Sequence, residues 1–240
     1  MHYFLLSDTL TEGVFKTWRK IVVQLVAFDN NGTVFNDLRI TYLGSVKVFE
    51  AFNLLPPTLE QYRNTVGGDF MKFYHNYGIP VPANEDEKKK LSADIGDVFW
   101  SHIKENIWRS SFRPDVAATI SELQRRGIRT AMISAMNESE LLEELDHYGF
   151  CGVFDPIFGG VKDKAPVMEH LCRSLKINPH STLYVGDTVE DMKAAREAGV
   201  IPVGMGAPDA YHSAERLRKL TSRLVDNLWD VIAIVKNLNC

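Results

Sequence analysis

Three apolar runs, each ending at a polar residue and followed by a helical pattern, limit the possible folds more than any other feature. The first covers residues 21–28 and is interrupted only by Gln24, and the later runs cover 130–133 and 183–185. Continuous apolar runs rich in Val are typical of parallel strands that are buried on both faces. Because strand and helix patterns alternate, we expect an α/β fold with a Rossmann-like parallel sheet flanked by helices.

Between Thr41 and Arg109 the pattern becomes helical and more aromatic, which interrupts this alternation. The aromatic side chains follow a helical spacing that is typical of a helical domain's own core; they are Phe70, Phe73, Tyr74 and Tyr77. We therefore expect an inserted α-helical cap. The expected division is an N-terminal extension over 1–20, a core over 21–40 and 110–240, and a cap over 41–109. The extension is equally compatible with an extra strand, a short helix or an oligomer contact.

Composition and charge exclude several partners. The formal net charge of -4 gives no general attraction to nucleic acid or to an anionic membrane. No stretch is long enough to span a bilayer, and the apolar start is too short for a signal peptide. Cys151, Cys172 and Cys240 lack metal-site spacing and fit free thiols in a reducing compartment. We expect a cytoplasmic protein without nucleic-acid or membrane partners, and the sequence leaves its oligomeric state open.

Asp29 follows the first apolar run directly and is followed by Asn30, Asn31 and the turn residue Gly32. A carboxylate in this position lies at the carboxyl edge of the sheet, where open α/β sheets bind ligands. A carboxylate at a strand end that is buried on one side and exposed on the other is well placed to act as a nucleophile or a metal ligand. Taken alone, the same string is also compatible with a capped turn after a core strand.

A second acidic pair follows the run at 183–185. Asp187 and Asp191 stand four residues apart at a strand-to-helix junction, so both can face the same direction. Hard oxygen ligands of this kind suit Mg²⁺. The structural alternative is an N-cap aspartate with a second acid in the first helical turn.

Ser134 and Lys164 complete the polar set. Ser134 ends the strand at 130–133 and can offer its hydroxyl and backbone N–H to an anion, although strand-end serines are common. Lys164 stands at a helix start near Pro166, where the helix dipole disfavours a cation unless an anion lies nearby. Lys162 is the rival for this role.

Together these four clusters resemble those of the haloacid dehalogenase (HAD) superfamily, whose members are mostly phosphatases, over nearly all of residues 21–236. The resemblance implies that Asp29 attacks phosphorus and becomes an aspartyl phosphate. It also implies roles for the other residues: Mg²⁺ binding by Asp29, the backbone carbonyl of Asn31, Asp187 and, in support, Asp191, and phosphoryl binding by Ser134 and Lys164.

Asn31 departs from the family pattern. Most phosphatases of the family carry an Asp there, two residues after the nucleophile, as the general acid and base. An amide cannot transfer a proton at neutral pH, and such help is typically worth ~10² to 10⁴ in rate. The protein is then a slow phosphatase, uses a leaving group that needs little protonation, or has lost turnover and kept binding. On this basis, Asn31→Asp is expected to raise the rate on alkyl phosphates.

The leading hypothesis is a Mg²⁺-dependent phosphatase of a small phosphorylated metabolite, similar to phosphoglycolate phosphatase. The alternative is a catalytically weakened, phosphate-binding regulatory protein of the same fold. The loop at Gly67 and Gly68 is the preferred place for specificity. Further cap side chains that can touch a substrate, each more often a solvated surface residue, are Arg63, Lys72, His75, Lys104 and Arg109.

Overall fold

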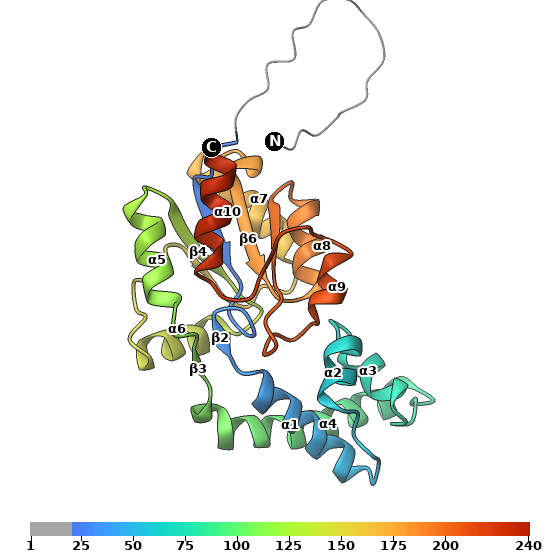
Figure 1. The fold of residues 1–240 in the computed structure, drawn as a ribbon. Helices are drawn as coiled ribbons and strands as arrows, with labels where there is room; N and C mark the ends of the chain where they lie inside the picture. Colours follow the sequence, from blue (N-terminus) through green and yellow to red (C-terminus); the bar gives the residue numbers. More distant parts are fainter. Residues whose placement is uncertain (1–20) are drawn as a thin grey trace, which may run out of the picture.

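The computed structural model describes residues 21–240, so the expected extension over 1–20 lies outside the described residues. Six parallel strands form one sheet in the order β5-β4-β1-β6-β7-β8 (Figure 1). Their bounds are β1 Leu25–Phe28, β4 Arg129–Ile133, β5 Ile157–Phe158, β6 Thr182–Gly186, β7 Ile201–Met205 and β8 Leu224–Val225. The expected α/β fold is confirmed.

The central strand β1 is buried on both faces. Val26 and Phe28 belong to a core cluster that includes side chains of α5, α6 and α10, whereas Leu25 and Ala27 belong to a second cluster with α7 and α8. This alternation follows from the two-residue period of a strand. The core helices are α5 Val116–Arg125, α6 Glu138–His147, α7 Lys164–Leu175, α8 Val189–Glu197, α9 Ala214–Arg218 and α10 Asp230–Asn239, with the 3₁₀ helix η2 at Pro179–Ser181.

The register of the sheet brings the polar strand ends to one edge. Phe28 is paired with Met132 of β4 and with Val185 of β6. The residues that follow these three strands therefore emerge at the same carboxyl edge of the sheet. They are Asp29, Ser134 and Asp187.

Four helices between the short strands β2 (Phe35–Asn36) and β3 (Ser111–Phe112) form a separate helical layer at this edge (Figure 1). They are α1 Leu38–Ala51, α2 Leu59–Thr65, α3 Phe70–Asn76 and α4 Glu85–Asn106, followed by the 3₁₀ helix η1 at Ile107–Arg109. The first helix begins three residues before the expected boundary at 41. The two connecting strands pair antiparallel, so the chain enters and leaves the layer side by side.

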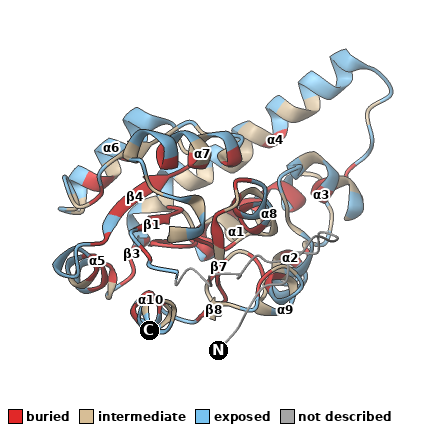
Figure 2. Cartoon of the chain, turned by 90° about the horizontal axis from the view of Figure 1, so that it is seen from above, coloured by how far each residue is buried: buried red, intermediate tan, exposed pale blue. Residues whose placement is uncertain are grey.

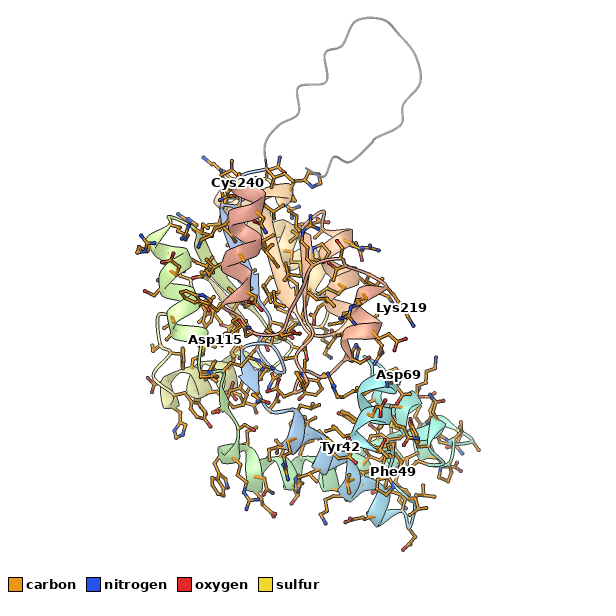
Figure 3. The ribbon with its side chains drawn as sticks, viewed as in Figure 1. Tyr42, Phe49, Asp69, Asp115, Lys219 and Cys240 are labelled. Atoms are coloured by element: carbon orange, nitrogen blue, oxygen red, sulfur yellow. The ribbon has the colours of Figure 1, made fainter. Side chains whose placement is uncertain are left out.

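The helical layer has its own apolar core. Phe49 of α1, whose side chain is drawn in Figure 3, packs against Phe73 and Tyr74 of α3. Phe70, which shares the aromatic spacing, is 48% exposed, and the outer surfaces of α3 and α4 are largely exposed (Figure 2). Within residues 21–240, no helix combines the length and apolar character needed to cross a bilayer.

Candidate active site

The turn after β1 is built around one carbonyl group. The Asn30 carbonyl oxygen accepts hydrogen bonds from the backbone N–H groups of Thr33, Val34 and Phe35, at 3.1, 2.9 and 3.0 Å. Gly32 has a positive φ of 76°, and a Cβ atom there would collide with the side chain of Asp187. Only glycine therefore lets this turn lie against the end of β6.

Three carboxylates meet beside this turn. Asp29, Asp187 and Asp191 each offer an oxygen within 4.8 Å of the others, and their exposed fractions are 7%, 0% and 1%. They come from the ends of β1 and β6 and from the first turn of α8. The structure thus brings together the acidic residues that the sequence singled out.

Lys164, the first residue of α7, lies between two of these carboxylates. Its Nζ atom is 2.8 Å from Asp29 Oδ1 and 2.7 Å from Asp191 Oδ1. Thr188 fixes the other Asp191 oxygen, because its backbone N–H and its hydroxyl both donate to Oδ2, at 3.0 and 2.6 Å. Lys162, the rival candidate, is exposed.

Burial and charge set the ionisation of this cluster. Burial raises the pKa of Asp29 to about 7, although the Lys164 ammonium opposes the shift. Burial, with the charges of Asp29 and Asp191, raises the pKa of Asp187 well above its usual range. For Asp191, the effect of burial is outweighed by Lys164, and its pKa is lowered. Ionisation of all three carboxyl groups would place an excess of negative charge beside one ammonium, so a bound cation would favour their ionised forms.

Ser134 lies at the end of β4 and is 2% exposed. Its backbone N–H donates to the Phe158 carbonyl at 2.8 Å, and its hydroxyl oxygen accepts from the Met136 N–H at 3.1 Å. The N–H that the sequence offered to an anion is thus engaged in the sheet. The hydroxyl hydrogen is the group of Ser134 that remains for a ligand.

The side chain of Asn31 pairs with a residue that sequence reasoning missed. Asn31 Nδ2 donates to Asp37 Oδ2 at 2.8 Å, and the Gly32 N–H donates to Asp37 Oδ1 at 3.1 Å. Asp37 is 5% exposed, and burial raises its pKa. Its place directly before the first helix of the layer was the available sequence signal.

Arg113 is a second residue that sequence reasoning missed. Its guanidinium is buried and donates to the carbonyl groups of Thr33 and Gly32, at 2.8 and 3.0 Å. It also forms an ion pair with Asp209 at 2.7 Å, and Asp209 accepts from Asn36 Nδ2 at 2.6 Å. Arg113 therefore ties the turn after β1 to the loop after β7.

A buried amide supports the turn from the side of α6. Asn30 is 0% exposed, and its Nδ2 donates to Glu144 Oε1 at 2.8 Å. Burial raises the pKa of Glu144 to about 7. The folded state therefore holds this proton more tightly than an unfolded chain, in which the pKa is near 4.5.

Glu144 consequently makes stability depend on pH. Between pH 4.5 and about 7 the folded state keeps the proton on Glu144 whereas the unfolded chain loses it. The contribution of Glu144 to the free energy of unfolding therefore falls as pH rises through this range. Glu144→Gln, which keeps an acceptor for Asn30, is expected to be more stable than the wild type near pH ~8 by about 1–3 kcal/mol and nearly equal near pH ~4.5. Urea unfolding at both values measures this, and an equal difference at both would contradict it.

The helical layer is fastened to the core by two arginines. Arg63 of α2 donates from Nε to the Ala210 carbonyl and from Nη2 to the Ala207 carbonyl, both at 2.8 Å. Arg216 of α9 donates to the carbonyl groups of Arg63 and Val66, at 2.9 and 2.8 Å. Arg63 therefore binds core carbonyls, a function different from the substrate contact that the sequence offered it.

The other residues expected to contact a substrate lie in different surroundings. The Gly68 N–H lies 3.5 Å from Glu190 of α8, so this loop faces the helix that carries Asp191. His75 Nδ1 is 3.0 Å from the Ile79 carbonyl within the layer. The remaining three candidates, Lys72, Lys104 and Arg109, are exposed.

Comparisons with known proteins agree with this architecture. A family model described as haloacid dehalogenase-like hydrolase matches residues 8–199. A phosphoglycolate phosphatase of Psychrobacter arcticus is 23% identical over 206 residues, covering 82% of this chain and 88% of the relative. A phosphoglycolate phosphatase of Aquifex aeolicus is 25% identical over 184 residues, covering 74% and 82%. The solved structure of a HAD family hydrolase from Deinococcus radiodurans with bound phosphate and sodium shares the fold, with a TM-score of 0.70, 18% identity and coverage of 91% and 97%.

Proposed function

The chain belongs to the haloacid dehalogenase-like hydrolases, and we propose that it is a Mg²⁺-dependent phosphatase of a small phosphomonoester. In this proposal Asp29 is the nucleophile and forms an aspartyl phosphate. The observation that carries it is the convergence of Asp29, Asp187 and Asp191 with Lys164 at one sheet edge. A nucleophile, a cation site and a donor for phosphoryl oxygens are the parts that phosphoryl transfer requires.

The donor set fits Mg²⁺, because buried carboxylate oxygens are the ligands that this cation prefers. Asp29, Asp187 and the backbone carbonyl of Asn31 would hold the ion, with Asp191 in support. When bound, the ion neutralises charge that develops on the phosphoryl oxygens. Asp191 also holds Lys164 beside Asp29, so the same acid orients the ammonium group.

The reaction proceeds in two displacements at phosphorus. A carboxylate oxygen of Asp29 forms a bond to phosphorus while the bond to the leaving oxygen breaks, and Ser134 and Lys164 donate to the phosphoryl oxygens. Water then attacks phosphorus, which releases inorganic phosphate and regenerates the Asp29 carboxylate. Asn31 cannot deliver a proton to the leaving oxygen, so solvent supplies it, and the rate depends strongly on the leaving group.

We further propose that the substrate is small. Asp29 is 7% exposed beneath a helical layer that Arg63 and Arg216 fasten to the core. A covered site of this kind excludes bulky phosphoesters and bulk water during reaction. The names of the relatives make phosphoglycolate the first compound to test.

A screen of phosphorylated metabolites with and without Mg²⁺ tests the proposal. We expect phosphate release that requires Mg²⁺ and is fastest for small phosphomonoesters and for activated aryl phosphates. A phosphoprotein that is hydrolysed as fast as a small phosphorylated acid would contradict the proposed size limit. Hydrolysis that continues unchanged after removal of divalent cations would contradict the proposed requirement for Mg²⁺.

Lys164→Ala is expected to weaken inhibition by inorganic phosphate ~10- to 100-fold, since a charged hydrogen-bond donor to the anion is lost. Lys162→Ala is the matched control, because Lys162 is exposed two residues away. Inhibition constants measured with Mg²⁺ present distinguish the two variants. Equal constants for both would remove Lys164 from the phosphoryl site.

A second function is favoured by one observation, the amide at position 31, which lacks the proton-transfer capacity of a carboxyl group. In this alternative the protein binds phosphate compounds with Mg²⁺ and regulates a partner without turnover. Calorimetry of phosphate binding beside a product assay at high protein concentration separates the two functions. Mg²⁺-dependent binding without any product would favour the alternative.

A further inference from the structure

Asp37 does not behave as a helix N-cap aspartate usually does. Such a residue accepts a hydrogen bond from a backbone N–H in the first turn of its own helix. Asp69, the N-cap of α3 (Figure 3), does so, because its Oδ1 accepts from the Lys72 N–H at 3.1 Å. Asp37 is the N-cap residue of α1 and makes no such side-chain bond. A local preference that is broken in this way points to a competing role.

The carboxylate of Asp37 instead faces the turn after β1. Its Oδ2 accepts from Asn31 Nδ2 at 2.8 Å and from the Tyr211 hydroxyl at 2.9 Å, and its Oδ1 accepts from the Gly32 N–H at 3.1 Å. Because a carboxylate only accepts, the nitrogen end of the Asn31 amide faces Asp37 and the oxygen end is turned away from it. The orientation of the amide beside the nucleophile is thereby fixed.

We propose that Asp37 is a positioning residue that acts through Asn31, a role that rests on the proposed function. Tyr211 connects Asp37 to two further residues. The Tyr211 hydroxyl is 2.7 Å from the Thr41 hydroxyl in α1, and the Tyr211 N–H donates to Asp187 Oδ2 at 2.6 Å. Asp37 thus joins the start of the helical layer, the turn and the acidic cluster in one hydrogen-bond network.

This network makes Asn31 and Asp37 a matched pair of amide and carboxylate. Asn31→Asp alone would set two carboxyl groups against each other where a 2.8 Å hydrogen bond now stands. The rate gain that the sequence predicts for this single change is therefore opposed by repulsion. The exchange variant Asn31→Asp with Asp37→Asn restores one amide and one carboxylate across the same contact.

The test compares the wild type, both single variants, the exchange variant and the control Asp69→Asn. Asp37→Asn is expected to lower kcat on an aryl phosphate with Mg²⁺ by ~10- to 100-fold with little change in KM, as for other supporting residues around metal sites. Asp69→Asn lowers the melting temperature by a few degrees at most and leaves kcat unchanged. The exchange variant recovers melting temperature and kcat relative to Asn31→Asp.

Two results would overturn the proposal. One is a kcat of Asp37→Asn equal to that of the wild type. The other is a decrease in the melting temperature of the exchange variant that equals the sum of the decreases in the two single variants. Wild-type turnover, measured first, tests the proposed function by itself. The melting temperatures need neither substrate nor metal, so they test the Asn31–Asp37 pair separately.

Discussion

Replacing Asp29 by Asn is expected to lower kcat by ~10⁴-fold or more, which corresponds to about 5 kcal/mol of lost transition-state stabilisation. The amide keeps the size of the side chain but cannot attack phosphorus as a carboxylate oxygen does. In the proposed mechanism every turnover passes through this bond. Initial rates on an aryl phosphate with saturating Mg²⁺ measure the loss.

The fold of the Asp29→Asn variant is expected to survive. Lys164 loses one charged partner but retains Asp191 at 2.7 Å, so its charge does not become isolated. A thermal unfolding curve close to that of the wild type is the control. Undiminished hydrolysis by this well-folded variant would assign the nucleophile elsewhere.

Arg113→Met is expected to have the largest effect on stability, about 2–4 kcal/mol. The buried guanidinium satisfies the carbonyl groups of Gly32 and Thr33, and its removal leaves these acceptors without their donor. The lost ion pair with Asp209 adds little to this figure, because the Asp209 side chain is 43% exposed and water can solvate it after Arg113 is removed. Urea unfolding of the metal-free protein gives the free energy directly.

Asp209→Asn is the matched control for this prediction. It removes the charge of the ion pair but leaves both carbonyl contacts of Arg113 in place, so we expect a loss of about 1 kcal/mol or less. Arg113→Met should also lower kcat, since the turn that carries Asn31 is no longer held. Equal losses for the two variants would show that the carbonyl contacts contribute little.

The sheet and the acidic cluster could be predicted from sequence because both depend on short-range patterns. A parallel strand buried on both faces reads as a continuous apolar run, and its polar end must emerge at the ligand-binding edge. The positions of Asp29, Asp187 and Lys164 at this edge follow from that rule together with the family pattern.

The supporting network could not be predicted, since it depends on side-chain directions between distant segments. Arg113 precedes a core helix, and nothing local indicates that it reaches the carbonyl groups of residues 32 and 33. Asp37 has the local signature of a helix cap, which tertiary contacts override. Phe70 matches the aromatic spacing of the layer's core but is the first residue of α3 and is 48% exposed, and periodicity alone cannot distinguish buried from exposed positions at a helix end.

Chemical trapping of the enzyme during turnover tests the central claim most directly. Borohydride reduces an aspartyl phosphate to homoserine, so we predict homoserine at position 29 in peptides from protein quenched during hydrolysis with Mg²⁺. The modification should be absent without substrate and in Asp29→Asn. Homoserine at another position, or rapid turnover with an unmodified Asp29 under conditions that trap acyl phosphates, would contradict the account.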